Sequence, residues 1–139
     1  MSLFRGINIS ASGLRAGRAR IDTIAQNIAN VDSRAEDGTP YRRKQVVLAP
    51  APTSLRPTRG PSRAGGVMIM GLQEDTSEPQ MVYRPDDPSA NAQGYVALPN
   101  VSLPVEMVDM VAATRAYEAN TAALRAGRDL AKRTLDILR

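Results

Sequence analysis

Apolar residues recur at helical spacing through the last third of the chain, residues 103–138. After Pro104 this stretch has no proline and only one glycine, Gly127, and its apolar residues return every three or four positions, which predicts a single long helix. One apolar stripe contains Val105, Val108, Ala112, Ala116, Ala119, Ala123, Ala126, Leu130 and Ile137. A second contains Met107, Met110, Tyr117, Leu124, Ala131, Leu135 and Leu138. Two stripes need two sets of neighbours, so we expect this helix to be covered by other long helices, in this chain or in other chains.

The start of the chain predicts a helix with the spacing of a coiled coil. Ile7, Leu14, Ile21 and Ile28 are seven residues apart, and Ile24 and Val31 occupy the alternate heptad position. Gly13 and Gly17 lie among them, and residues this small let another backbone come close. We therefore expect an N-terminal helical segment, residues 1–33, that packs against the C-terminal segment, residues 101–139.

Between these helices the pattern changes to short strands and turns. All ten prolines lie between Pro40 and Pro104. Short apolar runs bounded by turn residues predict strands at 44–48, 67–72, 80–84 and 94–97. Residues 49–66, rich in proline, glycine and arginine, predict an extended, mobile loop whose arginines face solvent or an anionic partner. The fold class is therefore α+β: two long terminal helices packed as a coiled-coil-like pair, with a small β-containing, proline-rich middle segment at 34–100.

Composition restricts the chemistry that the chain can perform. The chain has 139 residues, the length of a single domain. It contains neither histidine nor cysteine, and only 4% of its residues are aromatic. We therefore expect no disulfide and no zinc or cysteine chemistry. Adjacent acidic residues occur only in turn-like segments, and no nucleophile has a base at a useful spacing. The chain is predicted to be no enzyme and to bind no cofactor or metal.

The formal net charge of +4 leaves other functions open. A basic nucleic-acid-binding module is one alternative, but fourteen acidic residues oppose it and stacking aromatic residues are few. A soluble helical adaptor for one partner helix is another. No apolar run is long enough to span a membrane, and the first residues lack the features of a cleaved signal peptide, so no membrane insertion is expected.

Polar motifs interrupt the helical patterns at two places. Residues 25–33 read AQNIANVDS, with Asn27 and Asn30 near the end of the first helix, where one asparagine is explained as a helix cap and two are less easily explained. Residues 94–101 read GYVALPNV, with the asparagine at Asn100. In the second helix, Glu106-Met107-Val108 is followed at 115–120 by the pattern R-x-Y-x-A-N.

These motifs, in this order and together with PYRRKQVV at residues 40–47, resemble the axial proteins of the bacterial flagellum, the family of rod, hook and hook-associated proteins. The likeness covers nearly the whole chain. Ser102 departs from the family pattern, which usually has Asp or Asn there, but serine also caps helices. The segment 49–66 matches no family motif.

The resemblance implies a structural subunit of the proximal rod, which polymerises through its terminal helices into the hollow drive shaft that transmits motor torque. It implies a location in the basal-body rod, spanning the periplasm, after export through the flagellar type III apparatus without cleavage of a signal peptide. Other copies of the chain and other rod proteins are the expected partners, and neither nucleic acid nor direct membrane insertion is expected.

The resemblance also implies which residues hold helices together. Arg115, Tyr117 and Asn120 are expected to form interhelical hydrogen bonds, within the chain or between subunits, and Gly13 and Gly17 to allow close packing between subunits. The full set of candidate assembly and interhelix residues is Ile7, Leu14, Ile21, Ile28, Asn27, Asn30, Asn100, Glu106, Met107, Arg115, Tyr117, Ala119, Asn120, Ala123, Ala126 and Leu130.

Overall fold

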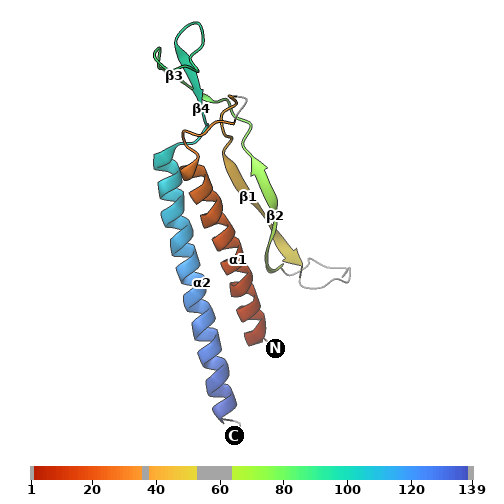
Figure 1. Ribbon diagram of the computed structural model, residues 1–139. Coiled ribbons are helices and arrows are strands. Elements are labelled where there is room, and N and C mark those ends of the chain that lie inside the picture. Colours follow the sequence, from red (N-terminus) through yellow and green to blue (C-terminus); the bar gives the residue numbers. More distant parts are fainter. Residues whose placement is uncertain (1, 36–37, 53–63, 138–139) are drawn as a thin grey trace.

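Two long antiparallel helices form the body of the protein in the computed structural model, which describes residues 2–35, 38–52 and 64–137 (Figure 1). Helix α1 spans Ser2–Ala29 and helix α2 spans Leu103–Ile137. The predicted α+β class is confirmed, because four strands accompany the two helices. The backbone carbonyl of Ser102 accepts the first hydrogen bond of α2, 3.0 Å from the Glu106 nitrogen, which places Ser102 at the helix start.

The strands form two antiparallel hairpins. Strand β1 (Lys44–Pro52) pairs with β2 (Ala64–Glu74), and β3 (Gln80–Tyr83) pairs with β4 (Tyr95–Leu98). The β1–β2 hairpin lies along α1, whereas β3–β4 lies beyond the helices, at the end of the molecule away from both termini (Figure 1).

All four predicted strands are present, but β1 and β2 extend further than the sequence indicated. The prediction of a loop at 49–66 is wrong at both ends, because residues 49–52 and 64–66 belong to paired strands. Proline is tolerated there because each strand of a two-stranded hairpin has a free edge, and the register shifts between Pro50 and Pro52. The middle of that segment, including Arg56, Arg59 and Arg63, lies outside the described residues.

Helix α1 is the central layer, with α2 on one side and the β1–β2 hairpin on the other (Figure 1). Apart from Ile24, the buried side chains of α1 among residues 5–29 are small or polar: Ser12, Ala16, Thr23 and Asn27. The heptad residues Ile7, Leu14, Ile21 and Ile28 are only half-buried. The core is therefore thin, and a regular coiled-coil seam does not account for it.

Glycines fix how closely the two helices approach. A Cβ added to Gly13 would lie 3.0 Å from the Asn120 amide, and one added to Gly17 would lie 3.5 Å from the Tyr117 ring. At the other end of the seam, a Cβ on Gly127 would lie 3.1 Å from Ile7. The expectation that Gly13 and Gly17 serve contacts between subunits is thus corrected, because both face α2 of their own chain.

Neither helix, over the residues that the structure describes, is long and apolar enough to cross a membrane.

Candidate functional site

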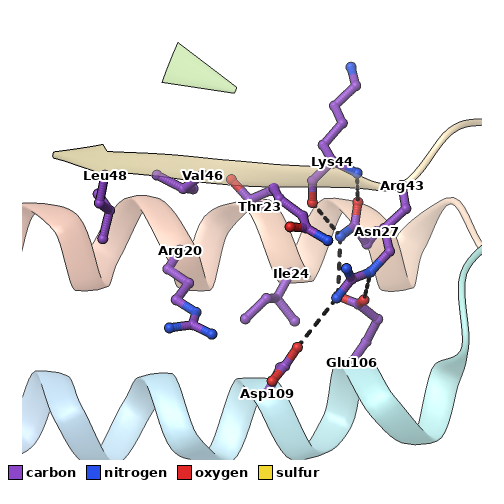
Figure 2. Close-up of a pocket in the computed structure, with 11 residues that line it drawn as sticks. Arg20, Thr23, Ile24, Asn27, Arg43, Lys44, Val46, Leu48, Glu106 and Asp109 are labelled. Atoms are coloured by element: carbon purple, nitrogen blue, oxygen red, sulfur yellow. Dashed lines mark hydrogen bonds and ion pairs between the residues drawn. The ribbon is translucent and has the colours of Figure 1, made fainter. Parts of the chain in front are cut away.

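The last turn of α1 carries a buried asparagine that uses its whole hydrogen-bonding capacity. Asn27 is 1% exposed. Its Nδ2 donates to the Lys44 carbonyl at 2.9 Å and to Glu106 Oε2 at 3.1 Å (Figure 2). Its Oδ1 accepts from the Lys44 amide at 2.9 Å and from the Tyr41 hydroxyl at 3.0 Å. An amide side chain offers two donors and two acceptor positions, so Asn27 joins α1, the start of β1 and α2 with no bond unused.

The partner from α2 is a carboxylate with no exposed surface. Glu106 is 0% exposed and forms an ion pair with Arg43 Nε, while Arg43 Nη2 also reaches Asp109 Oδ2 at 3.3 Å (Figure 2). A buried carboxylate is costly unless it is paired and hydrogen-bonded, and Arg43 and Asn27 supply both interactions. Glu106 lies in the first turn of α2, where the helix dipole also favours a negative charge.

A second asparagine, Asn100, binds the backbone next to Lys44. Asn100 Oδ1 accepts the backbone amide of Arg43 at 2.8 Å, and its Nδ2 donates to Ser77 Oγ at 2.8 Å and to the Asp75 carbonyl at 3.2 Å. We call Asn27, Tyr41, Arg43, Lys44, Asn100, Glu106 and Asp109 the polar junction. It connects both helices to the hairpins.

The Tyr41 hydroxyl is a hydrogen-bond donor in this junction. Burial, and then the negative charges of Glu74 and Glu106, raise the pKa of the Tyr41 hydroxyl above its ordinary value of 10.0. The hydroxyl therefore stays protonated at physiological pH and remains a donor to Asn27.

The β1–β2 hairpin has a second attachment to α1, far from the polar junction. Ser12, which is buried, accepts the Val67 amide at 3.1 Å and donates to the Ile9 carbonyl at 2.6 Å. Gly66, with φ +124°, lies so close that an added Cβ would be 2.2 Å from Ser12 Oγ. Ser12 and Asn27 are about 22 Å apart along the helix, and β2 from Val67 to its end covers about the same length. The two contacts therefore hold the hairpin to α1 at both of its ends.

The two apolar stripes of α2 have different surroundings. Met110, Tyr117, Leu124 and Ala131 are half-buried on the side of α1. The other stripe is exposed, about 130° around the helix. We call its central residues the alanine stripe: Ala112, Ala116, Ala119, Ala123 and Ala126. Larger exposed residues continue it, with Val105 at 53%, Val108 at 68% and Leu130 at 56% exposure. Nothing in the described part of the chain covers this stripe.

The structure brings three predicted site residues, Asn27, Asn100 and Glu106, into the polar junction. Met107 beside them is exposed, and Asn30 lies outside the junction, where its Nδ2 donates to the Gln26 carbonyl at 2.7 Å as a helix-end cap. Ile7, Leu14, Ile21 and Ile28 contribute to the thin core, and Ala119, Ala123, Ala126 and Leu130 lie on the exposed side of α2.

Within the described part of the chain, Arg115, Tyr117 and Asn120 form no interhelical hydrogen bonds. Asn120 touches Gly13, but its amide donates to the Ala116 carbonyl at 3.0 Å, inside its own helix. Tyr117 lies against Gly17 through its ring, and Arg115 is exposed. A bond from these residues to another subunit remains a prediction.

Sequence reasoning missed Tyr41, Arg43, Asp109 and Ser12. Arg43 lies in the PYRRKQVV motif, whose role we did not assign, and a buried Glu106 would have required such a cation. Ser12 gave no signal, because a serine in a helix usually points to solvent or bonds its own backbone.

A pocket lies between α1, α2 and β1, and Arg20 projects toward α2 there (Figure 2). Arg20, Thr23, Ile24 and Val46 line it together with five of the junction residues, Asn27, Arg43, Lys44, Glu106 and Asp109. No cluster of potential metal ligands occurs among the residues that the structure describes.

Comparisons with known proteins match both helical segments. Residues 7–33 match the family model for the flagella basal body rod protein, and residues 92–137 match the model for the C-terminal part of the flagellar basal body rod FlgEFG proteins. Two terminal helices joined to small hairpins, with these matches, define a flagellar basal-body rod protein.

Individual relatives are more specific. The chain is 42% identical to the flagellar basal-body rod protein FlgC of Bacillus subtilis and 40% identical to that of Borreliella burgdorferi, over 99% of each chain. It is 37% identical to FlgC of Salmonella typhimurium, over 99% of this chain and 98% of the relative. The chain therefore belongs to the FlgC family of flagellar basal-body rod proteins. It is a structural subunit of the rod and not an enzyme.

Proposed function

We propose that this subunit builds the wall of the hollow proximal rod through its two terminal helices, with the hairpins on the outside. The exposed alanine stripe of α2 carries this proposal. A stripe of methyl groups, extended at both ends by large apolar residues, leaves space for a second helix at close range, and α1 occupies a different face. Burial of apolar surface stabilises by about 25 cal/mol per Å², so a contact repeated along the helix and around the tube adds up to many kcal/mol.

The polar junction gives the same subunit the stiffness that torque transmission requires. Asn27, Asn100 and Arg43 attach the start of β1 to both helices, and the buried ion pair of Arg43 with Glu106 joins α2 to it. A torque applied to the helices would thus pass to the hairpins through hydrogen bonds of fixed geometry, not through a flexible linker.

Assembly of this kind also accounts for the partners. We propose contacts with other copies and with other rod proteins, coiled-coil-like pairing of the helices in the rod, and interhelical bonds from Arg115, Tyr117 and Asn120 to neighbouring subunits. Export through the flagellar type III apparatus, without a cleaved signal peptide, would deliver the chain to the part of the rod that spans the periplasm. Family membership and the exposed stripe support this account.

The substitution Ala123→Arg tests the proposal. It places a long charged side chain where the stripe has a methyl group, and overpacking alone costs about 1–3 kcal/mol, with more for a charge left unpaired on burial. We expect cells that make and export the variant but lack rods and do not swim. Swimming on soft agar and electron microscopy of basal bodies measure this.

The matched control is Asp136→Asn, an exposed change near the end of the same helix, which we expect to leave swimming nearly unchanged. Arginine is a good helix former, so an Ala123→Arg strain with normal motility and intact basal bodies would show that the stripe faces solvent.

A further inference from the structure

The outward face of the β3–β4 hairpin is largely aromatic and uncovered. The register pairs Tyr83 with Tyr95 and Met81 with Ala97, so these four side chains share one face of the hairpin. The opposite face is the inner one, since its Val96 is 1% exposed. On the outward face, Tyr83 is 62% exposed, Met81 54% and Tyr95 43%. No helix or other strand of the described chain contacts this hairpin.

The two tyrosine rings are held in place although they are exposed. Their centroids are 5.4 Å apart and their planes are inclined at 64°, an edge-to-face contact. Tyr83 also lies against Gly94, where an added Cβ would be 2.8 Å from the Tyr83 ring and 3.4 Å from Pro85. Aromatic side chains that are already fixed lose little conformational entropy when they bind, which suits an interaction surface.

The polar surroundings of this face are acidic. Residues 74–95 contain five acidic side chains and one basic side chain, Arg84. Two of the acids are paired inside the chain, at 3.7 and 4.0 Å. The other three have no ion pair among the described residues: Asp75, Glu78 and Asp86. Glu78 and Asp86 flank β3, so a partner with positive charge complements this face.

A segment of the chain itself has the complementary chemistry. Residues 53–63, which lie outside the described structure, read TSLRPTRGPSR, with three arginines, two prolines and no acidic side chain. Arginine pairs with carboxylates and stacks on aromatic faces. Aromatic surfaces also recognise proline-rich segments, whose backbone has little freedom to lose on binding.

This segment is too short to reach the β3–β4 face of its own chain. Its ends are joined to Pro52 and Ala64, and eleven residues that leave and return extend at most about 20 Å from there. The nine residues of β1 cover about 27 Å between Pro52 and Lys44. The β3–β4 hairpin lies beyond the Lys44 end of β1 (Figure 1). The segment therefore meets this face only on another copy of the chain.

We propose that residues 53–63 of one copy dock on the outward β3–β4 face of a second copy. The arginines of the segment pair with Glu78 and Asp86, and its prolines lie against the Tyr83 and Tyr95 rings. The contact rests on the proposed assembly into a rod, to which it adds a contact between hairpins. The segment and the face are different surfaces, so the contact repeats from copy to copy in an open assembly.

Cysteine cross-linking tests the contact, because the chain has no cysteine of its own. In basal bodies from cells that produce Thr58→Cys and Gln93→Cys chains together, mild oxidation should yield a disulfide-linked dimer on denaturing gels. Neither variant alone should yield one. The matched control is Gln80→Cys with Thr58→Cys, since Gln80 is exposed but belongs to the opposite face of the same hairpin, and it should yield no dimer.

Absence of the dimer from rods of swimming cells overturns this contact and leaves the rod function intact. A thiol-to-amine linker that joins Gln93→Cys to a protein of another mass shows that a different partner covers the face, which also overturns the contact. Absence of the wild-type protein from purified basal bodies overturns the proposed function itself.

Charge reversal keeps the proposal testable if the cysteine variants fail to assemble. Arg56→Glu with Arg59→Glu should reduce the copies retained in basal bodies by about fivefold, the effect of losing two exposed ion pairs. Adding Glu78→Arg and Asp86→Arg to the same chain should restore them. Unchanged retention after the first pair, or no restoration by the second, shows that the segment and the face do not meet.

Discussion

Asn27 is at the end of a helix, where asparagine commonly acts as a cap. Its side chain instead points inward and forms hydrogen bonds with the backbone of β1. It pairs with the amide and the carbonyl of Lys44 in the way that a neighbouring strand would. This use explains why an amide is needed. A carboxylate at this position has no donor for the Lys44 carbonyl, and an alanine leaves four partners unsatisfied.

Asn27→Asp should therefore weaken the rod. The substitution removes the donor to Lys44 and places a second carboxylate against the fully buried Glu106, which costs about 1–3 kcal/mol for the unsatisfied group and more for the repulsion. The urea concentration at which isolated rods dissociate should fall.

Gln26→Glu makes the same change of amide to acid one position earlier, at an exposed side chain, and should leave the urea midpoint unchanged. Equal midpoints for Asn27→Asp and the wild type would show that the junction does not hold the assembled subunit together.

Among individual residues, the sequence identified three of the seven members of the polar junction. Asn27, Asn100 and Glu106 stood out because polar residues interrupt helical or strand patterns there. Arg43 and Tyr41 did not, because a cation and an aromatic residue in a loop fit a solvent-facing position equally well. The bonds among them depend on tertiary contacts between residues up to 79 positions apart, which no local pattern encodes.

Among the elements, the β1–β2 hairpin depends most on contacts with the rest of the molecule for its stability. A lone two-stranded hairpin is marginal in water, and this one rests on α1 at Ser12 and Asn27. Several of its large side chains are exposed on the surface, including Met70 at 62% and Leu72 at 57%. Its position therefore depends on the two polar contacts and on the close approach at Gly66.

Gly66→Ala should detach the far end of the hairpin. The new methyl group would overlap Ser12 Oγ, and the residue would also be strained at a positive φ. Hydrogen exchange measured by mass spectrometry on isolated rods should show faster exchange of residues 64–74.

Gly71→Ala is the matched control, since Gly71 also has a positive φ but open space around its Cβ position. If both variants exchange alike, backbone strain alone is responsible and the contact with Ser12 is unimportant.

The sequence predicted the helices to within a few residues and located every strand, because periodicity and turn residues are local signals. It failed at 49–52 and 64–66, where prolines and glycines hid strands that a free hairpin edge and α1 stabilise. It also could not tell which apolar stripe of α2 would face α1. Both stripes fit a helix partner, and only the glycine contacts of Gly13 and Gly17 distinguish them.

For the whole molecule, the three layers leave much apolar surface uncovered, and the seam between α1 and α2 is built largely on glycine and alanine. We therefore expect the purified monomer to show less helix by circular dichroism than the 28 and 35 residues of α1 and α2 would give, and proteases to cut both ends before the middle. Stable, protected terminal helices in a proven monomer would contradict this expectation.

The central claim is that a neighbouring subunit covers the alanine stripe, and the most direct measurement is the reactivity of a cysteine placed in it. Ala123→Cys adds one small thiol to a chain that has none. Maleimide should label this thiol quickly in the free protein and after dissociation of the rod, and at least about tenfold more slowly in intact basal bodies from motile cells. Equal labelling in intact and dissociated rods would show that the stripe stays open to solvent and would contradict the account.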